Sequence, residues 1–256
     1  MRSASKLWTT LWLAALLAAF GVSQASLAAE PAPPPNSPVV VELFTSQGCS
    51  SCPPADALLG ELAQREGVLA LSFHVDYWNY IGWKDPYSSP KMTDRQRTYM
   101  PALGQRYVYT PQMVIDGRYQ EVGSDETAIK RIVERLAGSG SRKLGISLVA
   151  GEGNRSTLRI PARPYSGEAA VWLIAFDDKH TTKIGRGENA GRTLSYFHVV
   201  RDIRRIGTWR GAAMEIPLDL TVERRSGFEN CAVIVQEAAA AGPIIGAVSM
   251  RLAAPR

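Results

Sequence analysis

The chain contains few residues that bind metals through nitrogen or sulfur. Its 256 residues include only three cysteines and three histidines. A structural zinc site takes four such ligands, usually in closely spaced pairs, and the sequence holds a single close pair, Cys49 and Cys52. A fold that depends on many disulfides is also excluded. With 45% hydrophobic residues at this length, the chain can build a core without them.

Motifs for several other activities are missing as well. No Gly-x-Ser-x-Gly element marks a serine hydrolase. The glycines of Gly185-x-Gly187-x-x-Ala190 do not lie between a strand and a helix, so they predict no dinucleotide cofactor. Nucleic-acid binding needs a dense basic stripe, whereas the nearest group of arginines here is typical of a solvated face: Arg201, Arg204, Arg205 and Arg210. We therefore expect neither a bound cofactor nor a nucleic-acid partner.

The start of the chain carries an apolar run between charged and small residues. Arg2 and Lys6 precede the run at 7–22, and small residues follow as far as Ala29. This order is typical of a secretory signal peptide. An uncleaved anchor is the alternative, but the run is short of the roughly 20 residues that cross a bilayer. We expect a signal at 1–29, a Pro-rich linker at 30–38, a periplasmic or secreted location, and no stable membrane span after cleavage.

The folded part begins with a strand, a helix and a second strand. Residues 39–44 form a β-branched apolar run, and residues 55–65 carry apolar side chains at helical spacing. Pro53 and Pro54 suit the first helical turn, where amide hydrogens lack partners. Residues 68–75 form another apolar run. A βαβ unit of this kind predicts two parallel strands.

The remaining elements divide near residue 140. An insertion at about 76–106, with a helix over 92–105, is followed by a predicted hairpin at 112–122 and a helix that Ser124 caps. Strand-like segments with turn residues between them fill the rest. We predict a thioredoxin-like α/β domain over 39–140, with a central mixed sheet flanked by helices. A mainly β, sandwich-like domain or extension follows over 141–256.

Cys49 and Cys52 lie between the first strand and the first helix. This position puts both sulfurs at a helix N-terminus, whose partial positive charge stabilises a thiolate. A thiolate attacks a disulfide, and a second thiol nearby resolves the mixed disulfide. We therefore expect Cys49, at an exposed lip, to be the attacking residue and Cys52, one turn further in, to be the resolving residue.

The order of elements resembles that of the thioredoxin superfamily. In that superfamily a cis-proline faces the cysteine pair, and Thr110-Pro111 occupies the matching position before the strand at 112–115. The resemblance implies that Pro111 shapes a groove for protein thiol or disulfide clients of the cell envelope. Gly48 stands where thioredoxins usually carry Trp, and Ser50-Ser51 replaces Gly-Pro. These departures leave the redox poise open.

A narrower resemblance is to the exported thioredoxin-like group called domain of unknown function 1223. The segments that carry this resemblance are Glu42–Asp56, His74–Trp78, Gly82–Pro86, Tyr109–Met113 and Gly187–Leu194. They are spread over most of the chain beyond residue 38. The name of the group implies no particular reaction.

Three possible supporting residues lie at the end of the second predicted strand and just after it. His74, near the end of that strand, is expected either to approach the cysteines or to be a hydrogen-bonded core residue. Asp76 is expected to accept a proton from Cys52, to orient His74 or to cap the next turn. Trp78 belongs to an aromatic run that either forms a platform for a partner polypeptide or packs the insertion onto the domain.

Two alternatives to redox exchange stay open. Cys49 and Cys52 can form a static disulfide in an oxidising compartment. Together with His74, the two thiolates can instead hold a soft ion such as Cu(I). Either alternative would make the chain a non-enzymatic binding module of the envelope. Cys231 is expected to be a buried free thiol.

Overall fold

A computed structural model describes residues 37–139, 143–237 and 242–252 of the chain. The predicted signal peptide and most of the predicted linker lie outside these ranges. No helix within these ranges combines the length and the apolar character needed to cross a bilayer.

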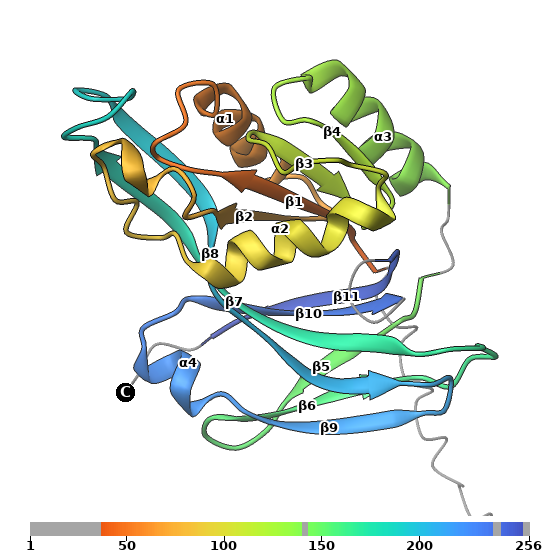
Figure 1. The fold of residues 1–256 in the computed structure, drawn as a ribbon. Coiled ribbons are helices and arrows are strands. Elements are labelled where there is room, and N and C mark those ends of the chain that lie inside the picture. Colours follow the sequence, from red (N-terminus) through yellow and green to blue (C-terminus); the bar gives the residue numbers. More distant parts are fainter. Residues whose placement is uncertain (1–36, 140–142, 238–241, 253–256) are drawn as a thin grey trace, which may run out of the picture. The chain divides into compact units, whose positions relative to one another are not determined.

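Eight strands form one mixed sheet (Figure 1). They are β1 (Val39–Thr45), β2 (Val68–His74), β3 (Gln112–Ile115), β4 (Tyr119–Val122), β7 (Ala169–Lys183), β8 (Thr193–Trp209), β10 (Asn230–Glu237) and β11 (Ile244–Arg251). Their order across the sheet is β11-β10-β7-β8-β2-β1-β3-β4. As the βαβ pattern predicts, β1 and β2 are parallel from one end to the other.

The β-rich C-terminal part continues this sheet. β8 pairs in parallel with β2 at Ser72 and Val199, and antiparallel with β7 over most of its length. β5 (Ser147–Ala150), β6 (Arg155–Ile160) and β9 (Met214–Asp219) form a separate sheet, and their buried side chains share a core with β7, β10 and β11. Two sheets therefore pack face to face, as a sandwich-like part requires. One of them also carries β1–β4, so residue 140 does not divide two separate sheets.

Helices cover both faces of β1. Side chains alternate along a strand, so Val41 and Leu43 point to one face and Val40 and Phe44 to the other. α1 (Pro53–Leu62) and α3 (Glu126–Gly138) pack on the first face, and α2 (Pro90–Ala102) packs on the second. Burial on both faces explains the continuous apolar run that predicts this strand. η1 (Asn79–Ile81) and α4 (Thr221–Arg225) are short.

Several helix boundaries differ from the predictions. α2 spans Pro90–Ala102 rather than 92–105. α1 ends at Leu62, before the predicted end. The N-cap of α3 is Asp125 rather than Ser124, because the Asp125 carboxylate accepts the Ala128 amide at 3.0 Å. These differences concern helix ends, where neighbouring residues can satisfy the free amides of the first turn or the free carbonyls of the last.

A buried ion pair fixes the insertion to the sheet. Arg95 of α2 donates from Nε to Oε1 of Glu42 on β1 at 2.7 Å, and from Nη1 to Gln236 of β10 at 3.2 Å. The hydroxyl of Tyr99 also bonds Glu42. Buried charges of this kind are tolerated because each has charged or polar partners.

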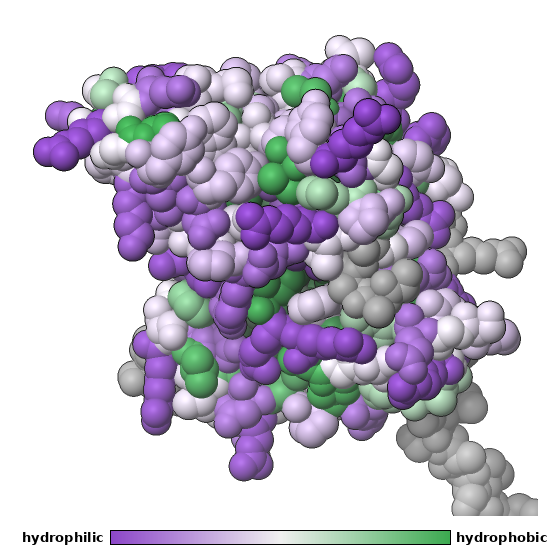
Figure 2. Space-filling model, viewed as in Figure 1, coloured by the Kyte–Doolittle hydropathy of each residue, from purple (hydrophilic) through white to green (hydrophobic). Residues whose placement is uncertain are grey.

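Hydrophobic side chains are scattered over the surface. On the face seen in Figure 2 they form small groups among hydrophilic residues. Within the described ranges, the large exposed ones lie on different elements: Tyr80, Tyr107, Val122, Val149 and Val222. Among the described residues, these exposed side chains point to no single partner surface.

Gly60 allows α1 to pack closely on β8. A Cβ at this position would lie 2.6 Å from two ring atoms of Phe197. Although alanine favours helices, we expect Gly60→Ala to lower the free energy of unfolding by about 1–3 kcal/mol through overpacking. Urea-unfolding midpoints measure this. Gly138→Ala in α3 is the control, since its added Cβ meets nothing within 4 Å. Equal midpoints for Gly60→Ala and the wild type would contradict the close packing.

Candidate functional site

A disulfide joins Cys49 and Cys52 in the turn that connects β1 to α1. Within the turn, the Cys49 amide donates to the Ser46 carbonyl at 3.1 Å and the Cys52 amide to the Cys49 carbonyl at 3.3 Å. Cys52 is the N-cap of α1, and its carbonyl accepts the amides of Ala55 and Asp56 at 2.9 and 3.1 Å. The pair therefore lies at the helix N-terminus, in the turn before the helix rather than in its first turn.

The prediction that Cys49 lies at an exposed lip is wrong. Cys49 is 1% exposed and Cys52 0%, whereas Ser50 and Ser51 between them are exposed. The turn is covered from two sides. A Cβ on Gly48 would lie 3.1 Å from both Trp78 and Ile81, so the insertion packs against it. On another side, Asn189 of the loop between β7 and β8 donates to the Cys49 carbonyl at 2.9 Å.

Pro111 lies beside the first turn of α1. Its peptide bond with Thr110 is cis, as the resemblance implies. A Cβ on Gly123 would lie 2.8 Å from the Cβ of Pro111 and 3.0 Å from the Cβ of Ala55, so these two side chains meet at Gly123. Trp78 connects the cysteine turn to the segment before Pro111, because it packs against Gly48 and its Nε1 donates to the Thr110 hydroxyl at 2.8 Å. Of the two roles predicted for this tryptophan, the packing role is the one observed.

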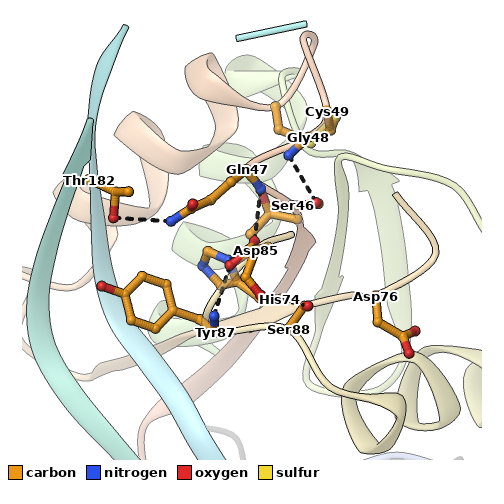
Figure 3. A network of polar contacts seen from close by, with 12 residues as sticks. Ser46, Gln47, Gly48, Cys49, His74, Asp76, Asp85, Tyr87, Ser88 and Thr182 are labelled. Carbon is orange, nitrogen blue, oxygen red and sulfur yellow. Dashed lines mark hydrogen bonds and ion pairs between the residues drawn. A yellow bond between two sulfur atoms is a disulfide. The ribbon is translucent and has the colours of Figure 1, made fainter. Parts of the chain in front are cut away.

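His74 forms a buried ion pair beneath the turn (Figure 3). Its Nδ1 lies 2.6 Å from Oδ2 of Asp85, and both side chains are 0% exposed. Burial alone would lower the pKa of His74, but the charge and hydrogen bond of Asp85 raise it above the ordinary value. Likewise, burial opposes ionisation of Asp85, but the charge and hydrogen bond of His74 hold its pKa below the ordinary value. Both shifts favour an imidazolium paired with a carboxylate.

Asp85 also binds the cysteine turn. Its carboxylate accepts the Gln47 amide and the Tyr87 amide, each at 2.9 Å (Figure 3). Gln47 lies two residues before Cys49. The ion pair therefore fixes the backbone that leads into the disulfide, and through it the position of Cys49.

Comparison with known proteins identifies the family. Residues 40–236 match the family described as "Protein of unknown function (DUF1223)". The chain belongs to the DUF1223 family. A crystal structure of an Agrobacterium tumefaciens protein is 36% identical with a TM-score of 0.72, and the match covers 83% of this chain and 93% of that one.

Two more distant relatives are similar to this DUF1223 protein. A "Probable Thioredoxin" from Archaeoglobus fulgidus is 30% identical over 101 residues, which cover 39% of this chain and 91% of that protein. HBP35 of Porphyromonas gingivalis has a TM-score of 0.61 at 18% identity, over 86% of this chain and 77% of that chain. The second likeness concerns the fold alone.

Asp76 of the DUF1223 protein lies apart from His74 (Figure 3). The hydroxyl of Thr93 in α2 donates to its carboxylate at 2.5 Å and accepts its amide at 3.1 Å. The Asp76 carboxylate thus binds α2, a contact that is neither the predicted cap of the next turn nor the predicted orientation of His74. The residue that orients His74 is Asp85, to which the sequence analysis assigns no role.

Asp56 is a second acidic residue that the sequence analysis does not single out. It is 4% exposed, and Thr45 donates to its carboxylate at 2.8 Å. Burial raises the pKa of Asp56 from 3.8 to about 7, although the charge of His74 and the Thr45 hydrogen bond oppose this shift. Asp56 lies three residues before Leu59, and residues three apart share one side of a helix. This spacing could have indicated that Asp56 is on the buried face of α1. The DUF1223 protein thus has a carboxyl group that titrates near neutral pH one turn beyond Cys52.

The contacts of His74 give no support to a metal site shared with the cysteines. Its Nδ1 is occupied by Asp85, and its Nε2 is buried without a hydrogen-bond partner. Over 37–139, 143–237 and 242–252, no group of three or more His, Cys, Asp or Glu side chains is arranged to hold a metal ion. This arrangement gives no support to a Cu(I) site made of Cys49, Cys52 and His74.

A groove of about 360 Å³ runs beside the cysteine turn. One wall comes from the start of α1 and the other from the start of β8. Its lining residues are Pro53, Pro54, Asp56, Ala57, Arg192, Thr193, Leu194, Ser195 and Phe197. The groove brings solvent to the face of α1 that follows Cys52.

Proposed function

We propose that this DUF1223 protein is an exported thiol–disulfide exchange protein with a thioredoxin-like domain. The observation that carries the proposal is the Cys49–Cys52 disulfide at the N-terminus of α1, together with the cis peptide bond of Pro111 beside the first turn of the same helix. The likeness to a "Probable Thioredoxin" over 101 residues supports it. The signal-like order of residues 1–29 supports export, and N-terminal sequencing of the protein from a periplasmic fraction tests that part.

In the proposed reaction, a client thiolate attacks the Cys49 sulfur of the oxidised protein. A bond forms between the client sulfur and Cys49, the Cys49–Cys52 bond breaks, and Cys52 leaves as a thiolate. A second client thiolate then displaces Cys49. The client gains a disulfide, and both cysteines become reduced and take up protons. The helix N-terminus stabilises the thiolate of the reduced pair, and we assign to Pro111 the shaping of the client groove.

Cysteine replacements test the proposal. The exchange is reversible, so the Cys49 thiolate of Cys52→Ser can attack a client disulfide by the reverse of the second step and release one client sulfur as a thiolate. Without the Cys52 thiol this mixed disulfide is not resolved, so we expect covalent complexes on non-reducing gels. Cys49→Ser removes the attacking sulfur and should form none. Cys231→Ser is the matched control, because Cys231 is buried on β10 and burial raises its pKa to about 12. Identical complexes with Cys52→Ser and with the double variant Cys49→Ser/Cys52→Ser would contradict the exchange function.

The burial of both sulfurs favours a second candidate, a static disulfide in a binding module for an envelope protein. A static bridge stays oxidised against a glutathione buffer that reduces exchange-competent pairs. Measuring the fraction of reduced protein across such a buffer series distinguishes the two candidates. A pair that remains oxidised throughout would replace the exchange proposal with this one.

A further inference from the structure

The loop between β7 and β8 contains a buried asparagine whose amide group binds the cysteine turn. Asn189 is 1% exposed. Its Nδ2 donates to the carbonyl of Gln47 at 3.0 Å and to the carbonyl of Cys49 at 2.9 Å. Both amide hydrogens are therefore used on the two carbonyls that flank Gly48. On the other side, Asn189 Oδ1 accepts from the Arg192 guanidinium at 2.9 Å.

The backbone of this loop is well ordered by its own hydrogen bonds. The Ile184 amide donates to the Arg192 carbonyl, and the Gly191 amide donates back to the Ile184 carbonyl, each at 2.9 Å. The loop also rests on Trp83, because a Cβ on Gly185 would lie 3.1 Å from the Trp83 ring. These backbone hydrogen bonds and the packing against Trp83 hold the loop, and with it Asn189, in place.

The Gln47 side chain adds further hydrogen bonds between the cysteine turn and the residues around this loop. Its Oε1 accepts the Trp83 Nε1 at 2.9 Å, and its Nε2 donates to the Thr182 hydroxyl of β7 at 3.1 Å (Figure 3). Nearby, a carboxylate oxygen of Glu188 accepts the Ser50 amide at 3.3 Å. The contacts of Thr182, Glu188 and Asn189 join the β7–β8 hairpin to residues 47–50, and Trp83 joins Gln47 to the insertion.

We propose that Asn189 is a positioning residue that holds the cysteine turn closed over its disulfide. Attack on a disulfide requires the incoming sulfur to reach Cys49 along the line of the S–S bond, and a residue that is 1% exposed does not permit this approach. Exchange therefore follows release of the two Asn189 hydrogen bonds. We call these two Asn189 hydrogen bonds the clamp. Its biological role rests on the proposed function, whereas its effect on access to the disulfide does not.

Reduction by dithiothreitol tests the clamp without any client. A dithiothreitol thiolate attacks Cys49, Cys52 leaves as a thiolate, and the second dithiothreitol sulfur displaces Cys49. The reagent becomes a cyclic disulfide and both cysteines become thiols. We expect Asn189→Ala to speed this reaction about tenfold in the folded, full-length protein, because closure loses two hydrogen bonds. Iodoacetamide trapping and mass spectrometry give the rate.

Two further measurements separate a clamp from a general loss of structure. Reoxidation should accelerate together with reduction, so the equilibrium constant with dithiothreitol should change much less than either rate. Arg192→Ala, at an exposed position, removes the support of Asn189 Oδ1 and should give a smaller increase without unfolding the chain. Asn154→Ala is the control, since Asn154 donates to Thr221 at a distant loop and should leave the rates unchanged.

The outcome distinguishes this inference from the proposed function. Reduction rates of Asn189→Ala and Arg192→Ala within twofold of the wild type would overturn the clamp, whatever clients exist. An absence of trapped clients with Cys52→Ser, together with a faster reduction of Asn189→Ala, would retain the clamp and overturn the exchange function.

Discussion

Replacing Asp85 with alanine is expected to lower the free energy of unfolding by about 3–5 kcal/mol, the usual range for breaking a buried ion pair. The variant leaves the His74 imidazolium without its partner in a site that is 0% exposed. It also deprives the amides of Gln47 and Tyr87 of their acceptor. Buried donors without partners add to the loss. Urea unfolding at pH 7 measures the difference.

A surface ion pair provides the matched control for this prediction. Arg159 and Glu215 lie 2.9 Å apart with side chains 57% and 63% exposed. Because water screens such pairs, Glu215→Ala should cost less than about 1 kcal/mol. Asp85→Asn keeps the shape of the side chain and removes its charge, so the pKa of His74 should fall in an NMR titration. Similar losses for Asp85→Ala and Glu215→Ala would show that the His74–Asp85 pair does not stabilise the fold.

Local patterns in the sequence predict the N-terminal elements well. β1, α1 and β2 follow from apolar runs and helical spacing, and the β3–β4 hairpin follows from Asp116-Gly117. The sequence also predicts that strands fill the part of the chain beyond residue 143, as observed. Their placement is not predicted, because β8 joins β2 through a parallel contact at Ser72 and Val199. No local signal specifies which distant strand becomes a neighbour.

In the candidate site too, features marked by short motifs are predicted, whereas contacts between residues far apart in the chain are not. Cys49, Cys52 and the Thr110-Pro111 bond are predicted, because a short motif or a resemblance marks each of them. The burial of Cys49 is not predicted, since it depends on Asn189, which is 140 residues further along the chain. Asp85 is missed for a similar reason, because Asp76 is closer to His74 in sequence but bonds to Thr93 instead.

Asp56→Asn is expected to remove much of the dependence of stability on pH between about 4 and 7. The pKa of Asp56 is about 7 in the folded chain, against an ordinary value of 3.8. In this interval the folded protein holds a proton that the unfolded chain releases. The free energy of unfolding of the wild type therefore falls as pH rises. Between pH values below 3.8 and above 7, the shift in the pKa of Asp56 lowers the free energy of unfolding by roughly 4 kcal/mol in total.

Asparagine mimics the protonated carboxyl at every pH and can still accept the Thr45 hydrogen bond. We therefore expect Asp56→Asn to match the wild type near pH 4 and to exceed its stability at pH 8. Some decline above pH 6.5 should remain, because the raised pKa of His74 acts in the same direction. The exposed Asp94, which pairs with Arg97 at the surface, gives the control Asp94→Asn. If both variants followed the wild-type profile in urea unfolding from pH 4 to 8, Asp56 would be ionised in the folded protein throughout this interval.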